Sequence, residues 1–396
     1  MDCKVIVLGK NYSTPIGVIR SLANAGYPVD LLYVATNKGD SEIVAASKYL
    51  NRTIEVIGRH DQEIVDALLT NYADSDSRCV LFPTDDYTTL LIDRFHDRLS
   101  KRFLFPYVID GSVAQKMDKS FQSKLAATCG LKTAREWVIS LDTDDISLPK
   151  DIPFPCFVKP MISAAGGKSE LGRCDDLLQL DAKLHKMQNR LRERCVLVQE
   201  FLSIRQEYTF GGICNDQTVI LPGIIKKTRV AQHFRGITMS GIMVENDELG
   251  DEMAKILRFL KSIRLVGMFD MEVMLTDRGL YFGELNLRCG GPSYAYFMSG
   301  INLPALAVKA VCGESLDGSG SAMTFNKRFV NNKVAYEDYA YLFIGASELK
   351  QMFTESDFTL MTDKNDPVPE ERFFKQLKPE YQKLRIKNQI KRILGR

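Results

Sequence analysis

Carboxylates and one amide alternate with apolar residues in two neighbouring segments, Phe269–Val273 and Tyr281–Arg288. Side chains alternate between the two faces of a strand. The polar faces so formed carry Asp270 and Glu272 in the first segment and Glu284, Asn286 and Arg288 in the second. The turn Thr276-Asp277-Arg278 predicts a hairpin that brings these faces together. Such oxygen ligands suit Mg²⁺ that also binds phosphate oxygens. The alternative is a surface hairpin whose acids face water.

Two lysines and a glycine-bearing loop could supply a phosphate site. Lys119 follows Met117-Asp118, and Lys159 ends a short apolar strand, where a solvated surface lysine is less expected. The loop Ser163–Ser169 contains Gly166 and Gly167. Its small side chains and free backbone N–H groups would let a phosphate approach closely.

A third segment has the pattern of a nucleoside site. The apolar strand Val196–Leu202 runs into a connector, and Glu207 follows five residues after Leu202. Backbone groups of the connector could bind an adenine, and the carboxylate could bind a ribose.

The elements that position these residues fall into two classes. In residues 1–110, short apolar runs alternate with amphipathic stretches, which predicts βαβ units and a parallel sheet. One loop at its carboxyl end contains Asp85 and Asp86, which could cap a helix or contact a substrate. From residue 111 the pattern predicts helices at Gly111–Cys129 and Asp247–Ser262 with mainly antiparallel strands between and after them, as in an α+β domain.

Composition narrows the class of protein. The chain has 396 residues, with 52 Lys and Arg against 50 Asp and Glu. Residues 375–396 carry eight cations and one anion, which leaves the rest of the chain net acidic and excludes a generally basic nucleic-acid binder. The nine cysteines form no C-x-x-C pair, which indicates neither a disulfide framework nor a zinc site. The sequence shows neither a signal sequence nor an apolar stretch long enough to span a membrane, and we therefore expect a cytoplasmic protein.

Taken in order, these motifs resemble the ATP-grasp superfamily over about residues 111–313. The elements that carry the resemblance are Met117-Asp118-Lys119, Val158-Lys159-Pro160, the Gly166-Gly167 loop, Gln199-Glu200-Phe201-Leu202 with Glu207, and Glu284-x-Asn286-x-Arg288-x-Gly290-Gly291. The resemblance implies an α/β and α+β chain with three parts. These are an N-terminal Rossmann-like domain (1–110), a two-part ATP-grasp domain (111–320) with a mobile lid at about 127–197, and a C-terminal extension with a basic helix (321–396).

The resemblance also implies roles for individual residues. The ATP contacts would be Lys119, Lys159, Gly166, Gly167, Lys168, Glu200, Phe201, Leu202, Glu207 and either Lys226 or Lys227. The ligands of two Mg²⁺ ions, or of Mn²⁺ in their place, would be Glu272, Glu284 and Asn286, with Asp270 behind them. Arg288 would act at the acyl-phosphate or acceptor site, and with Lys159 would be catalytic. The substrate contacts would be Asp85, Asp86, Arg229, Arg235, Arg288, Gly290 and Gly291.

Members of this superfamily phosphorylate a carboxylate with MgATP and let a nucleophile, most often an amine, displace the phosphate. The layout is similar to the carboxylate–amine ligases, which include D-aspartate ligases and L-amino-acid ligases. Arg229, Arg235 and Arg288 indicate anionic substrates, because guanidinium groups bind carboxylates in a bidentate way. A carboxyphosphate enzyme like biotin carboxylase or carbamoyl-phosphate synthase and a non-catalytic ATP-binding regulator are the alternatives. The sequence leaves open whether the chain forms a homodimer.

The basic tail predicts a helix from Pro379 to Arg396, after a loop at Asp363–Glu371. One face would carry Ile386, Ile390, Ile393 and Leu394, flanked by cations. This helix could pack on the protein through its isoleucines or lie peripherally on the inner membrane surface. In the second case, a lipid-linked cell-wall or polysaccharide precursor would be a natural acceptor.

Overall fold

The computed structural model describes residues 3–11, 13–58, 60–72, 79–107, 111–142, 146–161, 172–189, 194–214, 218–233, 236–314, 316 and 323–394. The first sheet is parallel, in the order β3-β2-β1-β4-β5. It comprises β1 (Val5–Gly9), β2 (Val29–Ala35), β3 (Leu50–Ile57), β4 (Cys79–Pro83) and β5 (Phe103–Leu104), with helices α1 (Ser13–Asn24), α2 (Glu42–Ala45), α3 (Asp61–Asn71), α4 (Asp86–Arg94) and α5 (His96–Leu99). β1 and β2 are buried throughout, as apolar strands covered on both faces must be. The predicted Rossmann-like unit is confirmed.

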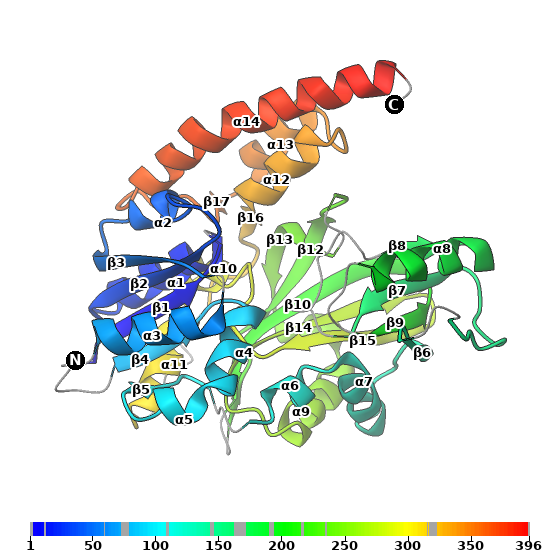
Figure 1. The fold of residues 1–396 in the computed structure, drawn as a ribbon, viewed down its shortest axis with the longest axis horizontal. Helices are drawn as coiled ribbons and strands as arrows, with labels where there is room; N and C mark the ends of the chain where they lie inside the picture. Colours follow the sequence, from blue (N-terminus) through cyan, green and yellow to red (C-terminus); the bar gives the residue numbers. More distant parts are fainter. Residues whose placement is uncertain are drawn as a thin grey trace.

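A second, mostly antiparallel sheet crosses the middle of the molecule (Figure 1). Its strands lie in the order β15-β14-β10-β12-β13-β16-β17, and β11 pairs with β10. They are β10 (Ile204–Cys214), β11 (Val219–Ile220), β12 (Ile224–Val230), β13 (Thr238–Val244), β14 (Gly267–Thr276), β15 (Gly279–Asn286), β16 (Arg328–Val330) and β17 (Phe358–Thr359). β14 and β15 form the predicted hairpin.

A smaller antiparallel sheet lies at the end of the molecule remote from the first sheet (Figure 1). Its strands are, in spatial order, β6 (Glu136–Ser140), β9 (Cys195–Glu200), β7 (Cys156–Pro160) and β8 (Gly172–Cys174), with α8 (Leu177–Gln188) packed beside them. This unit has its own apolar core, which includes Val158, Val198, Leu180 and Leu184. The parallel sheet is thus followed by two antiparallel sheets, which agrees with the fold class predicted from the sequence.

The helix predicted at Gly111–Cys129 is two helices, α6 (Val113–Lys116) and α7 (Lys119–Thr128). The chain breaks at Asp118 because its side chain caps α7, accepting a hydrogen bond from Phe121 N at 2.7 Å. The helix predicted at Asp247–Ser262 is likewise a 3₁₀ turn, η2 (Asn246–Leu249), followed by α9 (Glu252–Ser262). Gly250 separates them with a φ of 50°.

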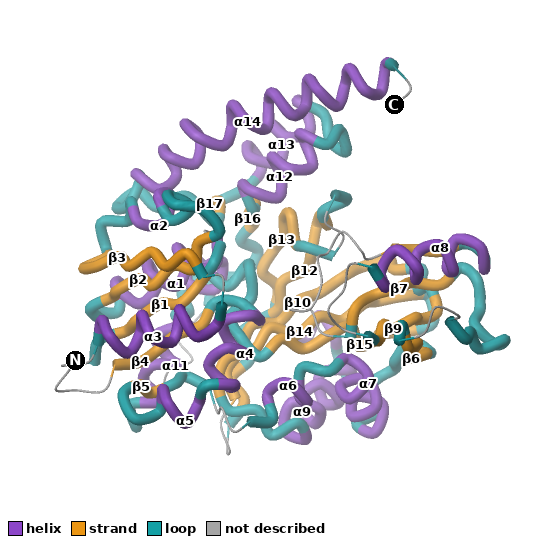
Figure 2. The backbone as a smooth tube through the Cα atoms, viewed as in Figure 1, coloured by secondary structure: helices purple, strands orange, loops and turns teal. Residues whose placement is uncertain are grey.

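Helices dominate the C-terminal part, as Figure 2 shows in purple. They are α12 (Asn332–Ala340), α13 (Ala346–Glu355) and α14 (Val368–Ile393), and α10 (Tyr294–Met298) and α11 (Leu303–Val311) precede them. The loop predicted to reach Glu371 ends earlier, since α14 begins at Val368, and the helix runs through Pro379. Of the two placements predicted for this helix, packing on the protein through its isoleucines is wrong, because Ile386, Ile390 and Ile393 are exposed. The packed residues are Phe373, Phe374, Leu377 and Tyr381.

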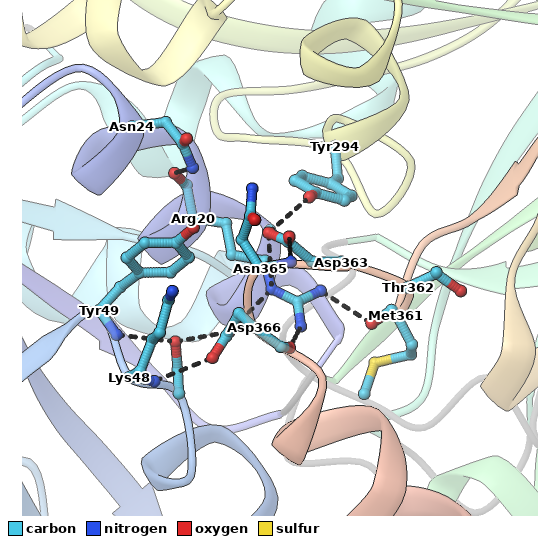
Figure 3. Close-up of polar contacts among 12 residues, drawn as sticks. Arg20, Asn24, Lys48, Tyr49, Tyr294, Met361, Thr362, Asp363, Asn365 and Asp366 are labelled. Carbon is cyan, nitrogen blue, oxygen red and sulfur yellow. Dashed lines mark hydrogen bonds and ion pairs between the residues drawn. The ribbon is translucent and has the colours of Figure 1, made fainter.

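A buried ionic cluster joins the C-terminal part to the first sheet. Arg20 of α1 is fully buried, and its Nε lies 3.0 Å from Asp366 Oδ2. The same guanidinium donates to the carbonyl oxygens of Met361 and Asp366 at 2.8 and 2.7 Å. Asp366 also accepts from Ser47 Oγ and Lys48 N. Figure 3 shows how these contacts enclose the guanidinium between α1 and the loop before α14.

Candidate active site

Two carboxylates face each other across the β14–β15 hairpin. Glu272 pairs directly with Glu284, and Asp270 pairs with Asn286. The register shifts after Glu272, where Gly283 is the extra residue on β15. A Cβ at Gly283 would lie 2.9 Å from the Glu272 carbonyl oxygen, so glycine permits the bulge. The Asn286 amide donates to Glu284 Oε1 at 3.3 Å. All three predicted metal ligands therefore lie in one group.

Lys227 of β12 places a positive charge next to this group. Its ammonium is buried, 2.9 Å from Glu207 Oε2 and 3.1 Å from Glu272 Oε1. Burial would lower the pKa of Lys227, but Glu272 and Glu207 outweigh it and raise the pKa. Lys226 instead bonds Glu248 at 2.7 Å on an exposed side of the strand. Of the two lysines left open by the sequence, the structure places Lys227 among the acids.

The electrostatics of Glu272 follow from this crowding. Burial raises the pKa of Glu272 to about 7, the attraction of Lys227 opposes that rise, and repulsion from Glu284 adds to it. The pair would thus gain from a divalent cation between or beside the carboxylates. Among the described residues, no group of three or more His, Cys, Asp or Glu side chains is placed to hold a metal. Two carboxylates and an amide fit Mg²⁺ that takes its other ligands from phosphate and water.

Lys119 and Lys159 approach the hairpin from two other elements. Lys119 Nζ lies 3.6 Å from Glu284 Oε2 and 3.5 Å from the carbonyl oxygen of Pro160 at the end of β7. Lys159 precedes that proline, and its pKa is lowered to about 8 by burial and then by the charge of Lys119. Two cationic groups thus act on Glu284, Lys119 by direct contact and Lys159 through its charge. The predicted phosphate loop, with Gly166, Gly167 and Lys168, lies outside the described residues.

The segment predicted to border adenine lies where the small sheet meets the hairpin. Glu200 Oε1 accepts from Arg135 N, and Glu200 Oε2 pairs with Arg278 of the hairpin turn, both at 3.0 Å. Phe201 N donates to Pro155 O at 3.1 Å. Leu202 belongs to a small apolar cluster with Ala134 and Tyr281, against which Met274 packs.

Arg288, which follows β15, links the hairpin to α4. Its Nε donates to Asp86 Oδ1 at 2.8 Å, and its Nη1 lies 3.5 Å from Asp270 Oδ2. Thr209 Oγ1 also donates to Asp270, at 2.9 Å. The backbone at Gly290 passes close to the Asp270 carboxylate, since a Cβ at Gly290 would lie 2.3 Å from Asp270 Oδ1. A Cβ at Gly291 would instead point into open space.

The other residues predicted to contact the substrate do not form one group in the structure. Asp85 caps α4, where its side chain accepts from Thr88 N at 2.9 Å, and burial raises its pKa. For this residue the capping interpretation is therefore confirmed. Arg229 forms an ion pair with Glu348 of α13, outside the group around Glu272. Arg235 lies outside the described residues.

Sequence reasoning missed two side chains that hold the site in place. The side chain of Gln122 donates from Nε2 to Leu285 O at 2.6 Å and accepts at Oε1 from Leu285 N at 3.0 Å. These two hydrogen bonds fasten α7 to β15. The buried Asp338 carboxylate accepts from Gln232 N at 2.7 Å and His233 N at 3.0 Å, which anchors the end of the β12 loop to α12. Only the charge of Asp338 within a largely buried helix could have signalled such a contact.

No protein-family model matches the chain. Among solved structures, the L-amino acid ligase of Bacillus licheniformis matches with a TM-score of 0.62 and 13% identity, over 81% of this chain and 77% of that one. The biotin carboxylase domain of the Hydrogenobacter thermophilus 2-oxoglutarate carboxylase, in complex with MgADP and bicarbonate, gives 0.65 and 16%, over 83% and 74%. Staphylococcus aureus N5-carboxyaminoimidazole synthetase with ADP gives 0.59 and 14%, over 79% and 78%. With the sheet orders above, these likenesses identify the fold of this chain as the ATP-grasp fold.

Proposed function

We propose that the chain is an ATP-dependent, ADP-forming ligase that joins a carboxylate to an amine. In the first step, a carboxylate oxygen attacks the γ-phosphorus of ATP, the bond from that phosphorus to the ADP oxygen breaks, and an acyl phosphate forms. In the second step, the amine attacks the acyl carbon, phosphate leaves, and a proton is lost from nitrogen. The product is an amide or peptide, formed on an amino acid or on a cell-wall or polysaccharide precursor.

The observation that carries this proposal is the convergence of Glu272, Glu284 and Asn286 with Lys119 on the ATP-grasp fold. Phosphoryl transfer needs positioning and charge neutralisation more than a protein nucleophile. When bound, Mg²⁺ at Glu272, Glu284 and Asn286 would neutralise phosphate charge. A binding-only module would not need two facing carboxylates at the phosphates, which disfavours the regulatory alternative.

The other predicted nucleotide contacts would have separate roles. Lys119 and Lys159 would hold phosphate oxygens. Lys227 would offset the repulsion between the carboxylates of Glu207 and Glu272. Glu207 would hold the ribose, and the Glu200–Leu202 connector would border the adenine. We further propose residues 127–197, which include most of the small sheet, as the lid that excludes water from the acyl phosphate, within the domain boundaries given above.

Arg288 is the residue we propose for the substrate carboxylate or acyl phosphate. Its Nε and Nη1 are held by Asp86 and Asp270, which fixes the plane of the guanidinium. Nη2 is the group we assign to the substrate, since a fixed guanidinium loses little freedom on binding an oxyanion. Asp86 would then act as a positioning residue for Arg288.

The test is a screen of amino acids and dipeptides for ADP formation, with the product detected by mass. ADP that forms only when an acid and an amine are both present supports the ligase. The similar fold of a biotin carboxylase domain makes carboxyphosphate chemistry the second candidate. ADP that forms with bicarbonate and without an amine would favour that candidate, and ATP binding without turnover under every condition would favour the regulator.

A further inference from the structure

The polar and ring contacts of the last turns of α14 with the protein come from one face of the helix. Arg385 donates to the carbonyl oxygens of Tyr339 and Ile344, the second at 3.1 Å. Asn388 Nδ2 donates to Ala340 O at 3.0 Å, and the Tyr381 ring stacks on Tyr336. Spacings of four and three residues place positions 381, 385 and 388 on one side of the helix. That side faces α12.

The opposite side of the helix is apolar and exposed. Ile386, Ile390, Ile393 and Leu394 are 57%, 51%, 83% and 63% exposed. At 3.6 residues per turn, these four positions centre about half a turn away from positions 381, 385 and 388. In Figure 1 the same turns of α14 extend past α12 and α13 at the edge of the molecule. The apolar stripe, defined by these four residues, is therefore directed away from the protein.

The charge around the apolar stripe is of one sign. Residues 381–394 include five cations, namely Lys383, Arg385, Lys387, Lys391 and Arg392, and no acid. Lys383 and Lys387 are exposed and lie beside the stripe on the helix surface. Exposed apolar residues with flanking cations suit a surface that offers both hydrocarbon and negative charge.

We propose that the apolar stripe of α14 binds an anionic membrane surface, with the helix lying in the plane of the lipid headgroups. Isoleucines would enter the boundary between headgroups and acyl chains, and Lys383 and Lys387 would contact anionic headgroups. Among the described residues, no helix is long and apolar enough to cross a membrane. A second copy of the chain fits less well, because a stable interface needs about 800 Å² from each partner and the stripe offers four side chains.

The test uses the full chain and vesicles of phosphatidylcholine with or without phosphatidylglycerol. We expect the chain to partition at least about tenfold more strongly into the anionic vesicles, and high salt to reduce this preference. The double variant I390Q/I393Q should lose most of that partition. The matched control is L177Q/L178Q on α8, because Leu177 and Leu178 are 55% and 82% exposed, nearly the same as the pair on α14.

Several outcomes would overturn the proposal. One is equal partition into neutral and anionic vesicles, and another is I390Q/I393Q binding as the unchanged chain does. A loss of binding in the control as large as in I390Q/I393Q would show that no particular surface is used. Light scattering in the absence of vesicles adds a fourth: a dimer that I390Q/I393Q converts to monomer would assign the stripe to a second copy.

Discussion

The ammonium of Lys227 lies 3.1 Å from Glu272 Oε1, inside the group of acids that we assign to the metal and the ribose. Removing it would leave Glu207 and Glu272 without their buried cation. Breaking a buried ion pair costs about 3–5 kcal/mol. We expect K227M to lower the free energy of unfolding by an amount near the smaller of these values, because the two carboxylates keep some contact with water. Urea denaturation followed by fluorescence measures this.

The neighbouring lysine provides the control for K227M. Lys226 pairs with Glu248 near the surface, so K226M should cost no more than about 1 kcal/mol. Equal effects of the two variants would contradict the special position of Lys227.

Glu284→Gln tests the metal role. The change keeps the shape of the side chain but removes a charge from the pair with Glu272. We expect the rate of ADP formation to fall by at least about a hundredfold, because the transition state loses charge stabilisation of several kcal/mol. Glu248→Gln lies outside this group and should keep nearly the full rate. Turnover of E284Q close to that of the unchanged enzyme would refute the assignment.

Local patterns predicted much of the site, and long-range contacts account for what they missed. The period-two alternation at residues 270–288 was enough to predict the hairpin and its polar faces. The bulge at Gly283, which sets Glu272 opposite Glu284, has no such periodic signal. Lys226 and Lys227 are adjacent and differ only in which face of β12 they occupy, and that depends on how β12 lies between β10 and β13.

Contacts between distant parts of the chain gave no local signal at all. Gln122 bonds Leu285, 163 residues away, and Arg20 bonds Asp366, 346 residues away. The C-terminal elements were hard to predict for the same reason. β16 and β17 are three and two residues long and are defined by pairing with other strands rather than by their own composition.

Nucleotide binding should weaken as the pH rises through about 8. Lys159 carries its charge below its pKa of about 8 and loses it above, so the free protein then offers less positive charge to the phosphates. The charged groups that act on it are Lys119, Glu284, Glu136 and Glu272. We expect the dissociation constant of a non-hydrolysable ATP analogue to increase between about pH 7 and pH 9, and K159M to remove the inflection near pH 8. An inflection unchanged in K159M would show that another group titrates.

The same shift has a consequence for stability with a definite sign. The folded pKa of Lys159 lies below the value of 10.5 that applies when the side chain is exposed. Between these values the unfolded chain binds more protons than the folded one, so Lys159 makes the free energy of unfolding rise with pH in that window. The unfolding free energy of the unchanged protein should therefore rise relative to that of K159M as the pH increases above about 8, as measured by denaturant titrations of both proteins at each pH.

Gly290 and Gly291 should respond differently to one added methyl group. A Cβ at Gly290 would clash with Asp270 Oδ1 at 2.3 Å, and Asp270 could move only by giving up its contacts with Thr209 and Arg288. We expect G290A to cost about 1–3 kcal/mol of unfolding free energy and G291A, where the space is open, to cost much less. Equal unfolding midpoints for the two variants would contradict the close approach.

The buried pair of Arg20 and Asp366 should hold the C-terminal part against the first sheet. Arg20→Met would leave Asp366 buried without its cation, since Ser47 Oγ and Lys48 N supply only hydrogen bonds. We expect a loss of about 3–5 kcal/mol, as for other broken buried pairs. We also expect faster amide hydrogen exchange in α1 and in the segment from Met361 to the start of α14. Arg94→Met breaks an exposed pair with Asp61 and is the control, with an effect of at most about 1 kcal/mol. Faster exchange confined to α1 would mean that other contacts hold the C-terminal part, because a link made by this pair must loosen both sides together.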